Sequence, residues 1–113
     1  MILKNLTTGE VVASQARRAE RWLERTIGFL SRREIDRQDA LWYPRCNSIH
    51  TVGMRVPIDV VFLDRRHRIV RLLCRVRQNR PWIMCRGASA VVELAPGVLE
   101  TTDVLQGDLL EMQ

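Results

Sequence analysis

A nearly continuous apolar run, IDVVFL at residues 58–63, constrains this fold more than any other stretch of the sequence. A short run of this kind, rich in β-branched side chains, is typical of a strand that is buried on both faces. Asp64 and the three residues after it have turn-like composition, and a second apolar segment follows at residues 69–76. The pattern therefore predicts a β-hairpin over residues 58–76.

Shorter strand-like segments surround the hairpin, and one segment has helical spacing. We expect further strands at residues 2–5, 10–13, 41–43, 49–54, 90–94 and 109–112. Apolar residues recur at helical spacing from Ala16 to Ile27, between a capping residue, Ser14, and a stop signal, Gly28. The prediction is an α+β, mostly β fold. It has a small barrel-like or curled antiparallel-rich sheet of about seven short strands, with one main helix over about residues 14–28 packed on it.

The length and the first residues of the sequence indicate how many domains to expect and whether to expect a signal peptide. The 113 residues suit one domain over 1–113, without a linker or an internal repeat. The opening MILKNLTTGEVV lacks the apolar core of a signal peptide, and nothing in the sequence approaches the roughly 18 apolar residues of a membrane helix. We therefore expect a cytoplasmic protein without a membrane span. The sequence does not indicate an oligomeric state.

The charge is basic, with a formal net charge of +5, and nearly all of the positive charge is arginine. The arginines are scattered along the chain, and aromatic residues make up only 5% of it. Proteins that bind nucleic acid usually concentrate their basic residues and add stacking aromatics. The pattern argues against a nucleic-acid partner, although weak binding through the scattered arginines stays open as a second alternative.

Cys46 and His50 are the first candidates for chemistry. They lie four residues apart, and Met54 follows four residues later, so a turn or helix here would create a soft set of metal ligands. On a strand, four residues span roughly 13 Å, and the pair would then need a turn at Asn47 and Ser48 to share an ion. The same pair could form an activated thiol, with Asp59 or Asp64 orienting the histidine. The plainer interpretation is a half-buried cysteine and a histidine bonded to backbone.

Asp59 and Trp82 are the other unusual positions. Asp59 lies inside the apolar run, where a bare carboxylate would cost several kcal/mol, so backbone amides or an arginine such as Arg55 or Arg86 should bind it. The structural interpretation of Asp59 is favoured over a functional one. Trp82 follows Pro81 in a loop, where it suits the lining of a ligand groove and the end of a barrel equally well.

The order of several motifs resembles the Domain of Unknown Function 192 family. The strings are TIGFLSR, CNSIHTVGMRVPIDVVFLD, RRHRIV, PW, AVVELAPG and GDLL. VPIDVVFLD is similar to the family's Ile-Pro-Leu-Asp strand, and VELAPG, which contains Glu93, to its Leu-Glu-Leu-x-x-Gly strand and turn. Many members carry Trp-Met-Lys-Asn-Thr where this chain has IHTVGM, so His50 stands in the place of a tryptophan. Many members also carry an export leader, which this chain lacks. The resemblance implies a small β-rich domain with one helix and implies no established activity.

The leading hypothesis is a non-enzymatic module that binds a protein or a small molecule, without a cofactor. Its groove would be framed by His50, Met54, Asp59, Trp82 and Glu93. The alternative is a small enzyme or metal-binding protein that uses Cys46 and His50 as its catalytic or metal-ligating residues.

Overall fold

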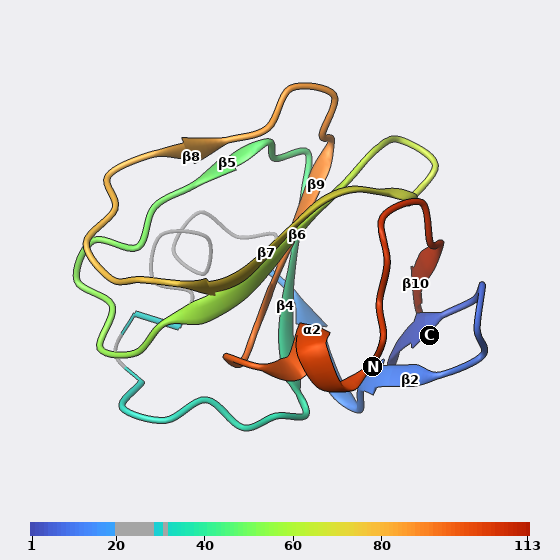
Figure 1. Ribbon diagram of the computed structural model, residues 1–113, viewed down its shortest axis with the longest axis horizontal. Helices are drawn as coiled ribbons and strands as arrows, with labels where there is room; N and C mark the ends of the chain where they lie inside the picture. Colours follow the sequence, from blue (N-terminus) through green and yellow to red (C-terminus); the bar gives the residue numbers. More distant parts are fainter. Residues whose placement is uncertain (20–28, 31) are drawn as a thin grey trace.

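The computed structural model describes residues 1–19, 29–30 and 32–113, and these contain ten strands and one short helix (Figure 1). The strands are β1 (Leu3–Asn5), β2 (Val11–Ala13), β3 (Gln15–Arg18), β4 (Asp39–Pro44), β5 (Ser48–Ile49), β6 (Ile58–Leu63), β7 (Ile69–Val76), β8 (Ile83–Met84), β9 (Ala90–Leu94) and β10 (Leu110–Met112). The helix is α2 (Val98–Thr101). In the described ranges, no helix is long and apolar enough to cross a membrane.

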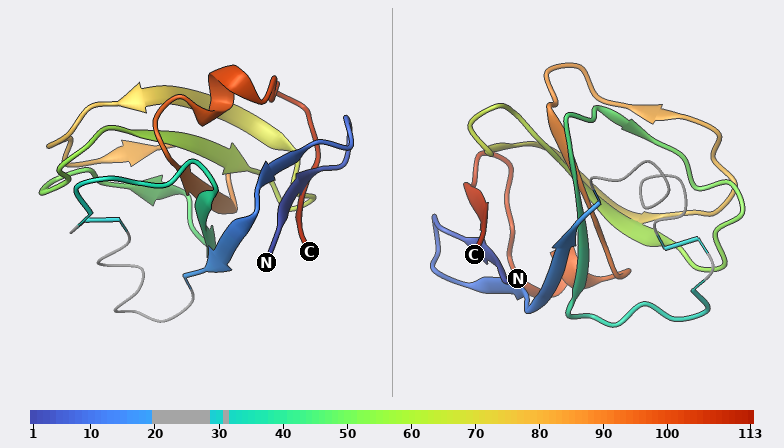
Figure 2. Two further views of the ribbon diagram at one scale, coloured as in Figure 1. Left: turned by 90° about the horizontal axis from the view of Figure 1, so that it is seen from below. Right: turned by 180° about the vertical axis from the view of Figure 1, so that it is seen from behind.

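The strands form three sheets. The largest has the order β3-β4-β9-β6-β7, a second has the order β10-β1-β2, and β5 pairs with β8 alone. The pairing of β3 with β4 is parallel, and the other strand pairs are antiparallel. Figure 2 shows the sheets curling around one another, with both chain ends on neighbouring strands. The predicted class, mostly β with curled antiparallel-rich sheets, is confirmed, with ten strands among the described residues instead of about seven.

The three inner strands of the large sheet are buried on both faces. Their side chains alternate between two hydrophobic cores, as the two-residue period of a strand requires. Trp42, Val61 and Val92 enter one core, while the neighbouring residues Tyr43 and Val60 enter the other. Every residue of β6 is buried, so the interpretation of the apolar run as a fully covered strand is confirmed.

The predicted hairpin over residues 58–76 is confirmed by the pairing of β6 with β7. Its turn is held by the Asp64 carboxylate, which accepts hydrogen bonds from the backbone amides of Arg66 and Arg68 at 2.8 and 3.0 Å. His67 has a φ of 65° in this turn. Histidine enters the left-handed region more readily than bulky or β-branched residues do.

The predicted helix over residues 14–28 is wrong at its start. Residues Gln15–Arg18 form β3, which lies parallel to β4 with Ala16 opposite Ala40. Ala16 is buried in the core, so a tertiary pairing overrides the local helical spacing here. The remainder of that prediction, at residues 20–28, lies outside the described residues.

The strand predicted over residues 49–54 is also wrong beyond its first residue. Only Ser48–Ile49 pair in β5, and the chain then turns. The Met54 amide donates to the Thr51 carbonyl at 3.1 Å, and Gly53 has a φ of 83° inside this turn. Glycine adopts that conformation without steric cost. The alternation of apolar residues around Gly53 therefore occurs in a turn and not in a strand.

Asp59 lies at the point where the β6–β7 pairing is irregular. Val60 pairs with Leu73 and Ile58 pairs with Val76, so the two residues Cys74 and Arg75 lie opposite the single residue Asp59. This is a β-bulge, which leaves backbone groups of the bulged strand without ladder partners.

The Asp59 carboxylate replaces those partners. One oxygen accepts the Arg75 amide at 2.8 Å, and the other accepts the Leu99 amide at 2.9 Å. Leu99 is in the first turn of α2, where amides have no partner within the helix. One buried side chain therefore joins β6, the bulge in β7 and α2. Of the predicted partners, backbone amides make these two hydrogen bonds, and Arg55 and Arg86 do not.

We expect Asp59→Asn to lower the free energy of unfolding by about 3 kcal/mol, because the amide keeps only one acceptor and leaves a buried N–H unpaired. Urea unfolding at pH 7 measures the change. Asp103→Asn is the matched control. Asp103 is exposed with a φ of 51°, a conformation that asparagine tolerates, so its effect should stay within about 0.5 kcal/mol. Equal effects of the two substitutions would contradict the anchoring role of Asp59.

Candidate functional site

Cys46 follows Arg45 at the end of β4, and His50 follows β5. The Cys46 thiol donates to the Ser48 carbonyl at 3.0 Å, whereas the His50 ring is exposed to solvent. Among the described residues, no hydrogen bond joins the two side chains, and no three His, Cys, Asp or Glu side chains gather as a metal site requires. The geometry gives no support to an activated thiol, and the chemistry predicted for this pair stays a prediction.

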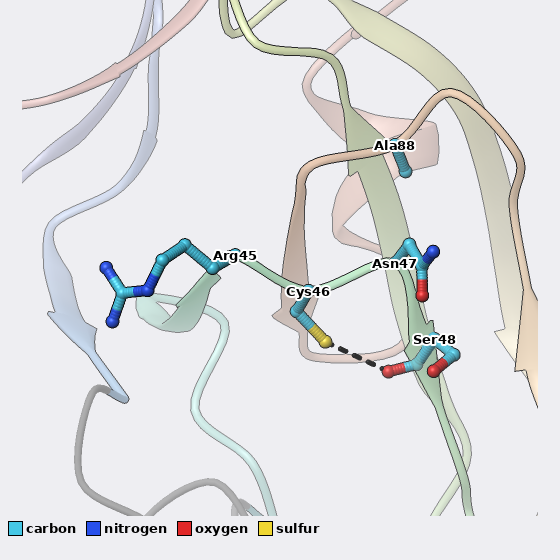
Figure 3. A pocket seen from close by; sticks show the side chains of 5 residues that line it. All are labelled: Arg45, Cys46, Asn47, Ser48 and Ala88. Atoms are coloured by element: carbon cyan, nitrogen blue, oxygen red, sulfur yellow. Dashed lines mark hydrogen bonds between the residues drawn. The ribbon is translucent and has the colours of Figure 1, made fainter.

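Cys46 borders an open cavity of about 320 Å³. Its lining residues are Arg45, Cys46, Asn47, Ser48 and Ala88. Figure 3 shows the bond from the thiol to Ser48 on one side and the Arg45 side chain extending in the opposite direction, away from the sulfur. The cavity wall is therefore mainly polar, and the guanidinium of Arg45 faces a different part of the surface.

Met54, His50 and Trp82 differ in exposure. Met54 is buried in the hydrophobic core, and Trp82 is 66% exposed. The Thr51 amide donates to the Arg80 carbonyl at 2.8 Å, so the segment that carries His50 runs beside the segment that carries Trp82. Of the residues predicted to frame a groove, His50 and Trp82 therefore lie on neighbouring exposed segments.

Asp59 and Glu93 lie on opposite faces of the large sheet. In the pairing of β6 with β9, Asp59 is opposite Leu94 and Val60 is opposite Glu93. Side chains that are directly opposite share a face, and consecutive residues alternate between faces. The two carboxylates consequently point into different cores, and a ligand on one face would not reach both.

Glu93 is a buried carboxyl group that accepts a hydrogen bond from Tyr43. Its side chain is 6% exposed and accepts a long bond, 3.4 Å, from the Tyr43 hydroxyl. Burial raises the pKa of Glu93 to about 7, although the Tyr43 hydrogen bond opposes this shift. Burial also raises the pKa of Tyr43, and the negative charge of Glu93 raises it further. Glu93 therefore changes its protonation near neutral pH inside the core.

A second cavity, of about 350 Å³, lies at one end of the large sheet and is basic. Its lining residues are Arg18, Trp42, Pro44, Arg45, Arg65, His67, Ser89 and Ala90. Three of these are arginines, and none is Asp or Glu. We call this cavity the basic pocket.

The register of the sheet explains why distant residues meet in the basic pocket. Ala90 at the start of β9 is opposite Pro44 of β4 on one side and Leu63 of β6 on the other. The end of β4, the start of β9 and the β6–β7 turn therefore come together. Arg18 joins them because it is opposite Trp42 in the parallel β3–β4 pair.

Two lining residues have unusual backbone or ring geometry. Arg45 has a φ of 52°, in the left-handed region that is costly for residues with a side chain. The His67 ring contacts the Trp42 ring edge-on, with centroids 4.9 Å apart at 78°. Strained backbone conformations cluster at functional sites, so Arg45 supports a functional interpretation of the basic pocket.

Our reasoning from sequence did not identify the basic pocket. It treated the arginines as scattered, and their separation along the chain hides the cluster. A weak signal existed for two of them, because Arg45 and Arg65 each lie just after a strand-like segment, whereas Arg18 lies in the segment predicted as a helix. Only the strand order shows that these ends are the same end of one sheet.

Glu93 predicts a specific dependence of stability on pH. The folded state holds this proton up to about pH 7, whereas the unfolded chain releases it near pH 4.5. Stability should therefore fall as the pH rises from 4.5 to 7, by up to about 3 kcal/mol from this group. Glu93→Gln is neutral at every pH and should remove the loss. Urea unfolding at pH 5, 6, 7 and 8 measures the difference.

Glu10→Gln is the control, because Glu10 is an exposed glutamate. Its stability curve should run parallel to that of the unmodified protein across this range. If the stability curve of Glu93→Gln also ran parallel to that of the unmodified protein, the effect assigned to the buried carboxyl would be contradicted.

Comparisons with known proteins show the family and the fold of this chain. A UPF0127 protein of Pyrococcus furiosus is 30% identical over 112 residues, covering 95% of this chain and 94% of that protein. A protein of unknown function from Novosphingobium aromaticivorans has a TM-score of 0.83 at 16% identity, over 98% of this chain and 82% of its own. A candidate transcription regulator of Sinorhizobium meliloti has a TM-score of 0.82 at 20% identity, over 97% and 89%. At these identities the two structures share the fold alone. The model of the DUF192 family, described as Uncharacterized ACR, matches residues 3–112, and the chain belongs to that family.

Proposed function

We propose that this protein is a non-catalytic binding module for a small anionic molecule, held in the basic pocket. The observation that carries the proposal is the lining of the pocket, whose described residues include three arginines and His67 and no carboxylate. A concave site with one sign of charge concentrates ions of the opposite sign. Guanidinium groups bind carboxylates and phosphates through paired hydrogen bonds, so either group suits this site.

The size of the pocket limits the ligand. A cavity of about 350 Å³ is at the low end of the range for small-molecule sites, roughly 300–1,000 Å³. Ser89 and the pocket's arginines offer hydrogen-bond donors, and Trp42, Pro44 and Ala90 supply an apolar wall. A compact anion with a few polar groups fits this combination better than a long peptide.

A binding role is better supported than a catalytic one. Arginine stays protonated at all ordinary pH values and does not exchange protons, so three arginines provide binding rather than acid–base chemistry. The thiol of Cys46, the candidate nucleophile, donates to the Ser48 carbonyl instead of to a base. The hypothesis of a groove framed by His50 and Trp82 concerns a different surface.

We expect pyrophosphate or citrate to raise the melting temperature of the protein beyond the effect of sodium chloride at equal ionic strength. Arg65→Gln should weaken this binding at least about tenfold, because a charge-assisted hydrogen bond contributes about 1.5–3 kcal/mol. Isothermal titration calorimetry at constant ionic strength measures the affinity.

Arg66→Gln provides a matched control. Arg66 is the next residue in the same turn, is exposed, and does not line the basic pocket. The two variants have the same net charge, so a general charge effect would weaken binding equally in both. Equal loss, or no binding of either anion by the unmodified protein, would contradict the proposal.

The strained residue of the pocket gives a second test. Arg45→Ala and Arg45→Gly both remove the guanidinium, and both should weaken anion binding to a similar degree. Only glycine relieves the left-handed backbone, so the glycine variant should be more stable than the alanine variant by about 1 kcal/mol. Thermal unfolding without ligand measures this difference, and equal stability would argue against strain at this site.

A further inference from the structure

The loops beside β5 and β8 carry an exposed apolar surface that the basic pocket does not use. Trp82 is 66% exposed, Val52 47% and Met84 42%. These apolar side chains are therefore open to solvent. We call this set of three residues the Trp82 surface. In Figure 1 the loop between β5 and β6 and the loop between β7 and β8 lie side by side at one end of the long axis.

A buried threonine holds the two loops together. The Thr51 hydroxyl donates to the Arg77 carbonyl at 2.8 Å and accepts from the Arg80 amide at 2.9 Å. The Thr51 backbone pairs with the Arg80 carbonyl and the Asn79 amide, both at 2.8 Å. The Trp82 surface is therefore ordered before it meets a partner, which lowers the entropic cost of binding.

The described residues of the two loops that carry the Trp82 surface include arginines and no carboxylate, and the exposed Glu34 lies against Val56 in the cavity that both line. Arg55, Arg80 and Arg86 are exposed on the same two loops or beside them. Residues 65–92 hold eight arginines and no Asp or Glu, and residues 40–58 also lack acidic side chains. Asp59 and Asp64 lie between these ranges. Asp59 is buried and bound to backbone amides, and Asp64 lies in the β6–β7 turn, where it accepts backbone amides. A partner of this surface should consequently be anionic.

We propose that the Trp82 surface docks on an anionic lipid bilayer. Tryptophan prefers the interface between lipid and water, and apolar side chains that project beyond the protein can enter that interface. Arginines beside them then meet the lipid phosphates, each contributing about 1 kcal/mol to membrane attraction.

A lipid surface fits the described residues better than a nucleic acid or a second copy of the chain. Single-stranded nucleic acids bind to several aromatic side chains in succession, whereas Trp82 is the only aromatic residue in these two loops. A second copy would bring the same arginines together, and like charges would repel. The inference does not depend on the basic pocket.

Sedimentation with vesicles tests the proposal. One vesicle contains only phosphatidylcholine, and the other contains phosphatidylcholine with about one third phosphatidylglycerol. The unmodified protein should bind the second vesicle at least about tenfold more tightly than the first. Raising the salt from about 0.1 M to about 1 M shortens the Debye length from about 10 Å to about 3 Å and should weaken the binding.

Trp82→Ala should weaken binding to the anionic vesicle about tenfold, because it removes the largest apolar group of the surface. Leu105→Ala is its matched control. Leu105 is 65% exposed, like Trp82, but it lies outside these loops, near Asp103, Gly107 and Asp108 in the sequence. Leu105→Ala should therefore leave binding to the anionic vesicle unchanged. Arg80→Gln should weaken binding to the anionic vesicle about fivefold. Arg66→Gln, which changes an exposed arginine of the β6–β7 turn, should weaken this binding less.

Several results would overturn the proposal. They are failure of the unmodified protein to sediment with the anionic vesicle, equal affinity for both vesicles, and equal losses in Trp82→Ala and Leu105→Ala. A fourth is binding of a thymidine oligonucleotide that depends on Trp82 without any vesicle binding, which would assign the surface to nucleic acid. Circular dichroism of each variant confirms that a loss of binding does not come from unfolding.

Discussion

Strand β9 is the element on which the rest of the structure depends. It pairs with β4 on one edge and with β6 on the other, and all five of its residues are buried. A strand covered on both faces and paired on both edges separates the protein into two cores and sets the register of its neighbours. That register places the end of β4 beside the β6–β7 turn. The basic pocket is consequently a product of strand order and not of any local motif.

The two buried acidic side chains of this sheet, Asp59 and Glu93, differ in their hydrogen-bond partners. Asp59 accepts two backbone amides, and these bonds connect a bulge in β7 to the first turn of α2. Glu93, on the other face, has one long bond from Tyr43, and burial raises its pKa to about 7. A carboxyl group that accepts two amides anchors the backbone around it, whereas burial beside one distant donor favours the neutral carboxyl. The sheet thus holds one side chain that anchors backbone amides and one carboxyl group whose pKa lies near neutral pH.

The two surfaces with proposed roles share a charge but differ in composition. The basic pocket is a cavity lined by arginines, and its size suits a small anion. The Trp82 surface carries exposed apolar side chains with arginines on the same loops or beside them. Both arise because acidic residues are almost absent from residues 40–92, where only Asp59 and Asp64 occur. The hydrogen bonds given for these two carboxylates come from backbone amides, and neither residue lines the basic pocket.

Local sequence determined the β6–β7 hairpin and the mostly β class of the fold. The fully apolar run of β6, the turn at Asp64 and the return strand β7 follow from composition and spacing, and the mostly β class follows from them. The need of Asp59 for backbone or charged partners also follows from its place in that run. Tertiary structure alone decided the rest. It drew residues 15–18 into a parallel pair with β4, and it ended β5 after Ile49 through a glycine turn. It also separated Asp59 from Glu93 by a sheet and gathered Arg18, Arg45 and Arg65 into one pocket. The physical reason is that periodicity reports which face of a segment is buried, whereas pairing between distant strands sets which segments become neighbours.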